Sequence, residues 1–249
     1  MSNPGASWFS ACAPEIRGEE NDRRMRSAIE PQGAAAWPHS VAEAGLIQNR
    51  LRAQVVAHDA LGRVQVVGSA DAWSEPEGNR IWAAAVALDL EDLELEESAI
   101  VCHRTTFPYV PGFLSFREAP AVLAALERMR MSPDLLLVDG HGLAHPRHFG
   151  LACHIGLLVG VPTIGVAKSV LIGRYEEPGL DRGQWAPLVH DGETVGAVLR
   201  TRPHTRPVFV SVGHRVSLGT AIDYVLRCTP TFRLPEPIRL ADRLSRVFR

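Results

Sequence analysis

The chain has 249 residues, of which 46% are hydrophobic, and its formal net charge at pH 7 is −2. This length suits one sizeable domain or two small ones, and the apolar fraction is ordinary for a folded globular protein. The near-neutral charge argues against wholesale electrostatic capture of a polyanion, although ten arginines and only three acids between Arg200 and Arg249 make the C-terminal fifth locally basic.

The N-terminal region differs in composition from the rest. Residues 1–38 mix Gly, Pro, Ser and Ala with the charged run RGEENDRRMR and show no sustained periodicity, so we expect a disordered extension, with Met25 as an alternative start. Behind Ser40, a suitable N-cap, apolar residues recur at helical spacing. The folded part is therefore predicted to be a single domain spanning residues 39–249.

Three extended segments follow, at residues 63–72, 80–90 and 97–107. A loop with Pro and Gly separates the first two and acidic turn residues separate the second pair, which predicts an antiparallel meander. The next segment, SFREAPAVLAALERMRM, has the apolar face of a helix, with Ser115 as its expected N-cap.

The second half alternates between strands and helices. DLLLV (134–138) is short and continuously apolar, as expected of a strand covered on both faces. We predict further elements in chain order: a helix at 147–160, strands at 162–168, 193–200 and 207–217, and a closing helix at 218–228. Three antiparallel strands and then helix, strand, helix, strand is the order of ribonuclease H-like folds. The sequence thus predicts an α/β protein with a mixed central sheet flanked by helices.

This topology makes a specific prediction about three acids. Right-handed crossovers place DLLLV beside the first strand of the meander, so Asp139 and Asp71 are expected to approach each other, with Glu118 on the intervening helix as a third candidate. Carboxylates this close repel one another unless a divalent cation lies between them, and oxygen ligands select Mg²⁺ or Mn²⁺. Taken singly, each acid also has an ordinary structural interpretation. Asp139 suits a turn, Glu118 can complement the dipole of its helix, and Asp71 can be an exposed acid at the end of a strand.

Three blocks of the sequence resemble the signature of a known family. These are FPYVPGFLSFREAPAVLAAL (107–126), PDLLLVDGHGLAHPRHFGLACHIGLLVGVPTIGVAKS (133–169) and VSVGHRVSL (210–218), and they resemble endonuclease V, a deoxyinosine-specific repair nuclease. The resemblance spans roughly residues 40 to 245. It implies a ribonuclease H-like fold, a Mg²⁺ cofactor that Mn²⁺ can replace, inosine-containing DNA as partner, and a nick at the second phosphodiester bond 3′ to the lesion.

The same resemblance assigns roles to individual residues. It implies that Asp71, Glu118 and Asp139 hold the metal and that Lys168 faces the scissile phosphate. It also implies that His214 lies beside the metal and helps to order the attacking water or the ligand shell. Lys168 is the single lysine among 26 basic residues. A compact ammonium supplies a point charge that the planar guanidinium of arginine would place differently. This difference would explain why a lysine, and not an arginine, stands at position 168.

The resemblance also implies a lesion-binding surface. Pro108, Tyr109, Val110 and Pro111 correspond to a stiff wedge whose aromatic ring fills the gap left by an extruded base. The residues expected to line the hypoxanthine pocket are Gly112, Leu114, Gly140 and His145. Arg147 is either a substrate contact or a structural partner of a buried carboxylate, and we expect His141 and His148 to lie at the surface or behind the contacting residues.

Alternatives remain open at this level. The segment SADAWSEPEG departs from the family pattern after Asp71, and Asp59 and Asp89 are weaker substitutes for that acid. The same chemistry on inosine-containing RNA is a second hypothesis, because only contacts to the 2′-hydroxyl discriminate the two. A non-catalytic lesion-binding protein is a third.

The cysteines and the apolar runs of the sequence bear on the cellular compartment in which the protein works. Four widely spaced cysteines (Cys12, Cys102, Cys153 and Cys228) show no metal-ligand spacing, so neither a zinc site nor a disulfide framework is expected. No apolar run reaches the roughly 18 residues of a membrane span, and the N-terminus lacks the apolar core of a signal peptide. We therefore predict a cytoplasmic protein with no membrane partner, while its protein partners cannot be named from the sequence.

Overall fold

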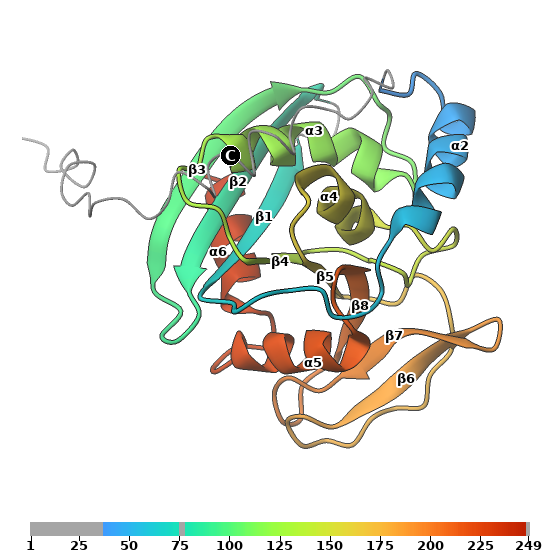
Figure 1. Ribbon diagram of the computed structural model, residues 1–249, viewed down its shortest axis with the longest axis vertical. Helices are drawn as coiled ribbons and strands as arrows, with labels where there is room; N and C mark the ends of the chain where they lie inside the picture. Colours follow the sequence, from blue (N-terminus) through green and yellow to red (C-terminus); the bar gives the residue numbers. More distant parts are fainter. Residues whose placement is uncertain (1–36, 75–77, 248–249) are drawn as a thin grey trace, which may run out of the picture.

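The computed structural model describes residues 37–74 and 78–247, and within them it contains one eight-stranded sheet of order β3-β2-β1-β4-β5-β8-β7-β6 (Figure 1). The predicted disordered extension lies almost entirely outside the described residues. The strands are β1 (Val66–Ser74), β2 (Arg80–Asp89), β3 (Leu95–Arg104), β4 (Leu135–Val138), β5 (Thr163–Ala167), β6 (Trp185–His190), β7 (Glu193–Leu199) and β8 (Val208–His214). The helices are α2 (Val41–Leu51), the short 3₁₀ helix η1 (Arg52–Gln54), α3 (Leu114–Glu127), α4 (Leu151–Val159), α5 (Leu218–Arg227) and α6 (Glu236–Ser245).

The pairing of the strands follows the predicted order. β1, β2 and β3 form the antiparallel meander, β4 pairs in parallel with β1, and β5 pairs in parallel with β4. Beyond β5 the sheet is antiparallel again, through β8, β7 and β6. The predicted α/β architecture with a mixed sheet is confirmed.

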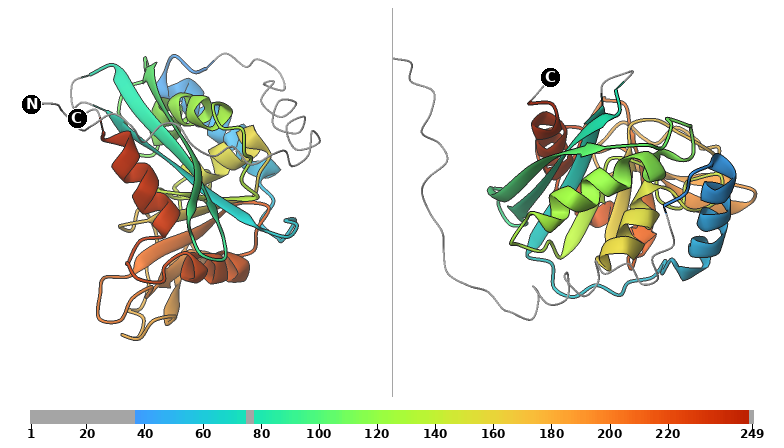
Figure 2. Two further views of the ribbon diagram at one scale, coloured as in Figure 1. Left: turned by 90° about the vertical axis from the view of Figure 1, so that its left-hand side faces the viewer. Right: turned by 90° about the horizontal axis from the view of Figure 1, so that it is seen from above.

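Helices cover both faces of the sheet. Figure 2 shows α3 and α4 on one side of the strands and α6 on the other. Because side chains alternate along a strand, β4 contributes to both apolar layers: Leu136 and Val138 pack with α3 and α4, whereas Leu135 and Leu137 pack in the layer that contains α5 and α6. This double coverage explains why β4 is apolar at every position.

Several details differ from the prediction. Helix α3 begins at Leu114 with Phe113 as its N-cap, so Ser115 is not the cap and is buried within the first turn. Helix α4 begins only at Leu151, and the preceding residues form a loop. Strand β6 and helix α6 were not predicted. Pro187 argues against a strand in the sequence, but β6 tolerates the proline because it is an edge strand. Pro235 and Pro237 likewise argue against a helix, although they stand at the start of α6, where proline is tolerated.

Among the described residues, no helix combines the length and the apolar character that crossing a membrane requires.

Candidate active site

Two aspartates lie side by side at the end of the parallel strands. Ala70 of β1 is in register with Val138 of β4, so Asp71 and Asp139, each one residue further on, are neighbours. Both follow residues that pack toward α3 and α4, so alternation turns the two acids to the face covered by α6. The strand order therefore brings together two of the three acids expected from the sequence.

The third carboxylate of the cluster comes from α6. Asp242 offers an oxygen that, with one oxygen each from Asp71 and Asp139, forms a group whose members all lie within 4.8 Å of one another. Within residues 37–74 and 78–247 this is the one such group of potential metal ligands. Sequence reasoning missed Asp242 because it predicted no helix after residue 228.

The electrostatics of the cluster favour a cation. Burial is the main cause that raises the pKa of Asp71 to about 6, and the charges of Asp139 and Asp242 add to it, while a hydrogen bond from Ser245 opposes the rise. Three partly exposed carboxylates around one point form the hard oxygen donor set that Mg²⁺ and Mn²⁺ prefer. The residues present therefore fit a divalent metal ion.

Glu118 lies near this cluster but outside the group of three. It projects from α3, and burial together with the charges of Asp71 and Asp139 raises its pKa to about 8. The carboxyl group is thus close enough to sense both aspartates. Of the predicted ligands Asp71, Glu118 and Asp139, the structure brings Asp71 and Asp139 together with Asp242, while Glu118 stands beside this group. That these residues bind a metal stays a prediction.

Lys168 contacts the cluster directly. It follows β5, and its Nζ lies 2.6 Å from Oδ2 of Asp139. Burial lowers the pKa of Lys168, but the hydrogen bond and charge of Asp139 outweigh this effect and the pKa is raised overall. The ammonium is therefore charged and held at the edge of the carboxylates.

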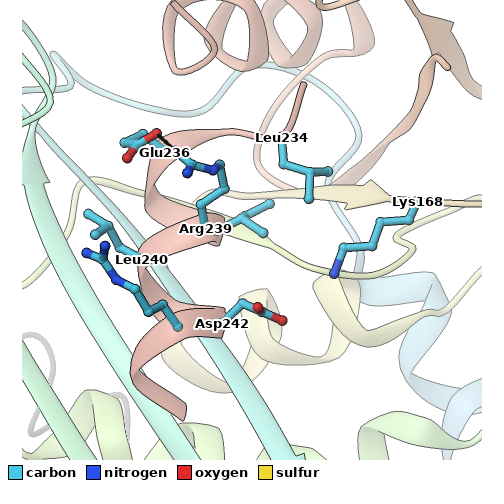
Figure 3. A pocket seen from close by; sticks show the side chains of 8 residues that line it. Lys168, Leu234, Glu236, Arg239, Leu240 and Asp242 are labelled. Atoms are coloured by element: carbon cyan, nitrogen blue, oxygen red, sulfur yellow. Dashed lines mark hydrogen bonds and ion pairs between the residues drawn. The ribbon is translucent and has the colours of Figure 1, made fainter. Parts of the chain in front are cut away.

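A pocket of about 290 Å³ opens beside Lys168 and along α6. In Figure 3 the side chains of Lys168 and Asp242 reach toward each other from opposite walls. The lining residues are Lys168, Leu234, Glu236, Ile238, Arg239, Leu240, Asp242 and Arg243. With three basic side chains next to the acids, this pocket can accommodate a phosphate backbone near a metal ion.

The predicted position of His214 is wrong. β8 runs antiparallel to β5, so Phe209 pairs with Ala167 near Lys168, whereas His214 pairs with Thr163 at the opposite end. Four residues along a strand correspond to about 13 Å. The Nδ1 of His214 instead accepts a hydrogen bond from the backbone of Val56 at 3.2 Å. Burial lowers its pKa to about 4, and the ring fastens the segment before β1.

The weaker candidates for the first acid have structural roles. Asp59 accepts hydrogen bonds from the backbone and hydroxyl of Ser217 and from the hydroxyl of Thr220, which fixes the start of α5. Asp89 accepts a hydrogen bond from the backbone of Glu91 in a tight turn. Neither belongs to the carboxylate group, which leaves Asp71 as the acid from this part of the chain.

The predicted wedge forms an exposed segment before α3. Tyr109 is 70% exposed, and Pro108 and Pro111 on either side are also exposed, while Val110 is half-buried. The backbone N–H of Phe113 donates to the carbonyl of Val110 at 3.0 Å and closes the turn. A projecting aromatic ring between two prolines suits insertion between bases.

The residues expected around the base pocket lie where this segment meets the loop after Asp139. Gly112 has a φ of +80°, which a side chain would strain, and Leu114 begins α3. Gly140 follows Asp139 directly and is partly exposed. A Cβ on the nearby Gly142 would lie 1.9 Å from the carbonyl oxygen of Val212, so that glycine is required by packing against β8.

His145 and Arg147 both form hydrogen bonds with backbone groups of the protein itself. His145 is 4% exposed, its Nδ1 accepts from the backbone of Arg147 at 3.2 Å, and its Nε2 lies 2.9 Å from the carbonyl of Gly112. Arg147 donates to the same carbonyl at 2.8 Å, and its guanidinium lies 4.1 Å from the centre of the Phe113 ring. Within the part of the chain that the structure describes, Arg147 thus pairs with no buried carboxylate, and the ring nitrogens of His145 are both engaged within the protein.

His141 and His148 lie in the same loop. Both are partly buried, and burial lowers the pKa of His141 to about 4. His148 has a φ of +50° and faces His190, with ring centres 6.3 Å apart. Neither belongs to the carboxylate cluster.

Comparison with known proteins gives a consistent result. The family model for endonuclease V matches residues 49–243. The endonuclease V of Trichormus variabilis is 54% identical over 210 residues, covering 84% of this chain and 95% of the relative. The crystal structure of endonuclease V from Streptomyces avermitilis has a TM-score of 0.82 at 45% identity and covers 85% of this chain and 94% of that one. The endonuclease V of Ciona intestinalis, in complex with a 24mer DNA containing an inosine followed by a ribo-adenosine, has a TM-score of 0.73 at 29% identity, covering 83% and 95% of the two chains.

Proposed function

This chain belongs to the endonuclease V family of nucleases, and on that premise we propose that it is a Mg²⁺-dependent repair endonuclease that recognises deoxyinosine and nicks the strand at the second phosphodiester bond 3′ to the lesion. The observation that carries the proposal is the cluster of Asp71, Asp139 and Asp242 beside Lys168. The inosine-containing DNA bound by the Ciona intestinalis relative supports the choice of substrate.

Asp71, Asp139 and Asp242 would hold the metal ion. When bound, Mg²⁺ activates water and neutralises charge on the phosphate, and Mn²⁺ can take its place. Glu118 would join from α3, because a nearby cation favours the ionised form of a carboxyl group whose pKa is raised to about 8 without it. We assign no role at the metal to His214.

Lys168 would bind the scissile phosphate. Its ammonium group is already fixed at the edge of the carboxylates by Asp139, so little reorganisation is needed when a phosphate oxygen arrives. Arg239 and Arg243 in the adjoining pocket would contact the backbone of the same strand. Such contacts add affinity without reading sequence.

Tyr109 would act as the wedge. Extruding a base costs a few kcal/mol, and least for a weakly paired base such as inosine. Stacking of an aromatic ring on the exposed neighbouring base recovers about 1–3 kcal/mol. The backbone around Gly112, Leu114 and Gly140 would then line the space for the extruded base.

The described cysteines accord with action in the cytoplasm. Cys102, Cys153 and Cys228 are all free thiols, as expected of a protein that works in a reducing compartment.

The test is a nicking assay on duplex DNA with one inosine, with and without Mg²⁺, beside the undamaged duplex. We expect a metal-dependent nick at the second bond 3′ to the inosine and none in the control. Matched RNA strands belong in the same assay, because the DNA bound by the Ciona intestinalis relative carries a ribonucleotide after the inosine. Lesion binding without any metal-dependent nick would overturn the enzymatic proposal, and a nick only in RNA would overturn the choice of substrate.

A further inference from the structure

The carbonyl group of Gly112 accepts three hydrogen bonds. Gly112 ends residues 108–112, which carry the exposed ring of Tyr109 and are called the Tyr109 segment below. The oxygen of Gly112 lies 3.1 Å from Nε2 of Gln48, 2.9 Å from Nε2 of His145 and 2.8 Å from a terminal nitrogen of Arg147. A carbonyl oxygen has two lone pairs, so three donors are more than this partly buried group needs. The backbone is thus held at this point from several directions.

The donors come from two distant parts of the chain. His145 and Arg147 belong to the loop that follows the metal-site residue Asp139, whereas Gln48 belongs to α2. The position they fix is also special, because Gly112 has a φ of +80° between the exposed segment and the start of α3. The network therefore connects the predicted wedge to the strand end that carries Asp139.

Gln48 is the member that closes the network. It is 1% exposed, its amide nitrogen also lies 3.1 Å from the carbonyl of Phe149, and its amide oxygen accepts a hydrogen bond from Nε of Arg147. Gln48 thus orients Arg147 and binds Gly112 at once. A buried glutamine costs free energy unless its amide is paired, and here both ends are paired.

We propose that Gln48 is a positioning residue that fixes the Gly112 carbonyl, directly and through Arg147, and so holds the Tyr109 segment rigid for entry into the duplex. This inference rests on the proposed function for the role of the segment, but not for its rigidity. Rigidity matters because a wedge that must be ordered on binding loses part of its stacking energy to that ordering.

The first test measures the segment in the free protein. Gln48→Met keeps the length of the side chain and removes its donor and acceptor, and Gln54→Met alters an exposed glutamine nearby as the matched control. Hydrogen–deuterium exchange is followed at the Phe113 amide, which closes the turn onto Val110. We expect exchange about tenfold faster in Gln48→Met and unchanged in Gln54→Met. Unchanged exchange in Gln48→Met would overturn the proposal, whatever the enzyme cleaves.

The second test asks whether Gln48 acts through Tyr109. A double-mutant cycle combines Gln48→Met with Tyr109→Ala and reads kcat/KM on inosine duplex against undamaged duplex. We expect each single variant to lower the preference for inosine by about tenfold and the double variant to lower it no further than Tyr109→Ala alone. Multiplying effects would contradict action through the wedge.

Thermal unfolding of the same variants separates positioning from general stability. A purely structural Gln48 would lower the melting temperature and reduce cleavage of every substrate without changing the preference for inosine, which would overturn the inference. If the wild-type protein does not nick inosine DNA at all, the proposed function fails, and the exchange measurement still decides the positioning role.

Discussion

The hydroxyl of Ser245 lies 2.8 Å from Oδ2 of Asp71, although the two residues are 174 positions apart. Ser245 is fully buried and stands three residues after Asp242, so both occupy the same face of α6, where it packs on β1. The last helix therefore supplies one carboxylate to the cluster and also orients another.

Ser245→Ala should weaken Mg²⁺ binding. A hydrogen bond to a charged group contributes about 1.5 kcal/mol, so we expect roughly tenfold lower affinity, because Asp71 loses the donor that opposes its protonation and fixes its orientation. Calorimetric titration of the protein with Mg²⁺ measures this. Ser98→Ala, on the exposed edge strand β3, is the control and should bind as the wild type does. Equal affinities for the two variants would show that Ser245 only packs.

Asp242→Asn should abolish metal-dependent nicking while leaving the binding of inosine DNA in place. The substitution is nearly isosteric, but it removes the charge of one of the three carboxylates that would hold the divalent ion. We expect nicking to fall by at least about a hundredfold and Mg²⁺ affinity to fall with it. Asp223→Asn, on the exposed side of α5, is the matched control. Wild-type nicking by Asp242→Asn would remove Asp242 from the site.

The difference between the predicted and observed clusters has physical causes. The pairing of Asp71 with Asp139 was predictable, because a strand that is apolar at every position belongs in the middle of the sheet and next to β1. Asp242 was not, because the prolines around the start of α6 conceal its amphipathic pattern. His214 was misplaced because a conspicuous sequence block does not reveal which end of an antiparallel strand faces the site.

The contacts of the loop after Asp139 were also not predictable from the sequence. His145 was predicted to lie at the base pocket, and Arg147 was left open between a substrate contact and a structural partner of a buried carboxylate. In the structure both bind the Gly112 carbonyl. Sequence alone shows that such residues are unusual after a buried strand. It does not distinguish contacts to a ligand from contacts to another loop, since both require the same donors.

Lys168→Met should change metal binding and catalysis in opposite directions. The ammonium competes with a metal ion for Asp139, whose Oδ2 lies 2.6 Å away, so its removal should raise Mg²⁺ affinity by roughly tenfold. Nicking should nevertheless fall by about a hundredfold or more, because a phosphate oxygen loses its donor. Parallel titrations and nicking assays test this. Lys168→Arg should keep the wild-type Mg²⁺ affinity, and weaker Mg²⁺ binding by Lys168→Met would contradict the competition.

Glu118 should make the metal-free protein less stable as the pH rises from 6.5 to 8. Its pKa is about 8 in the folded protein against an ordinary value of 4.5, so the folded state retains a proton that the unfolded chain has released. The contribution of Glu118 to stability therefore declines with pH through this window. The histidines whose pKa burial lowers to about 4 (His141, His145, His154 and His214) act in the opposite direction, because imidazoles of the unfolded chain are still partly protonated near pH 6.5. The contribution of Glu118 is therefore read in a chelating buffer as the melting temperature of Glu118→Gln minus that of the wild type, and this difference should grow by about 2–4 °C from pH 6.5 to 8. Glu127→Gln, an exposed acid of the same helix, should show no such change; a constant difference for Glu118→Gln would show that another group holds the proton.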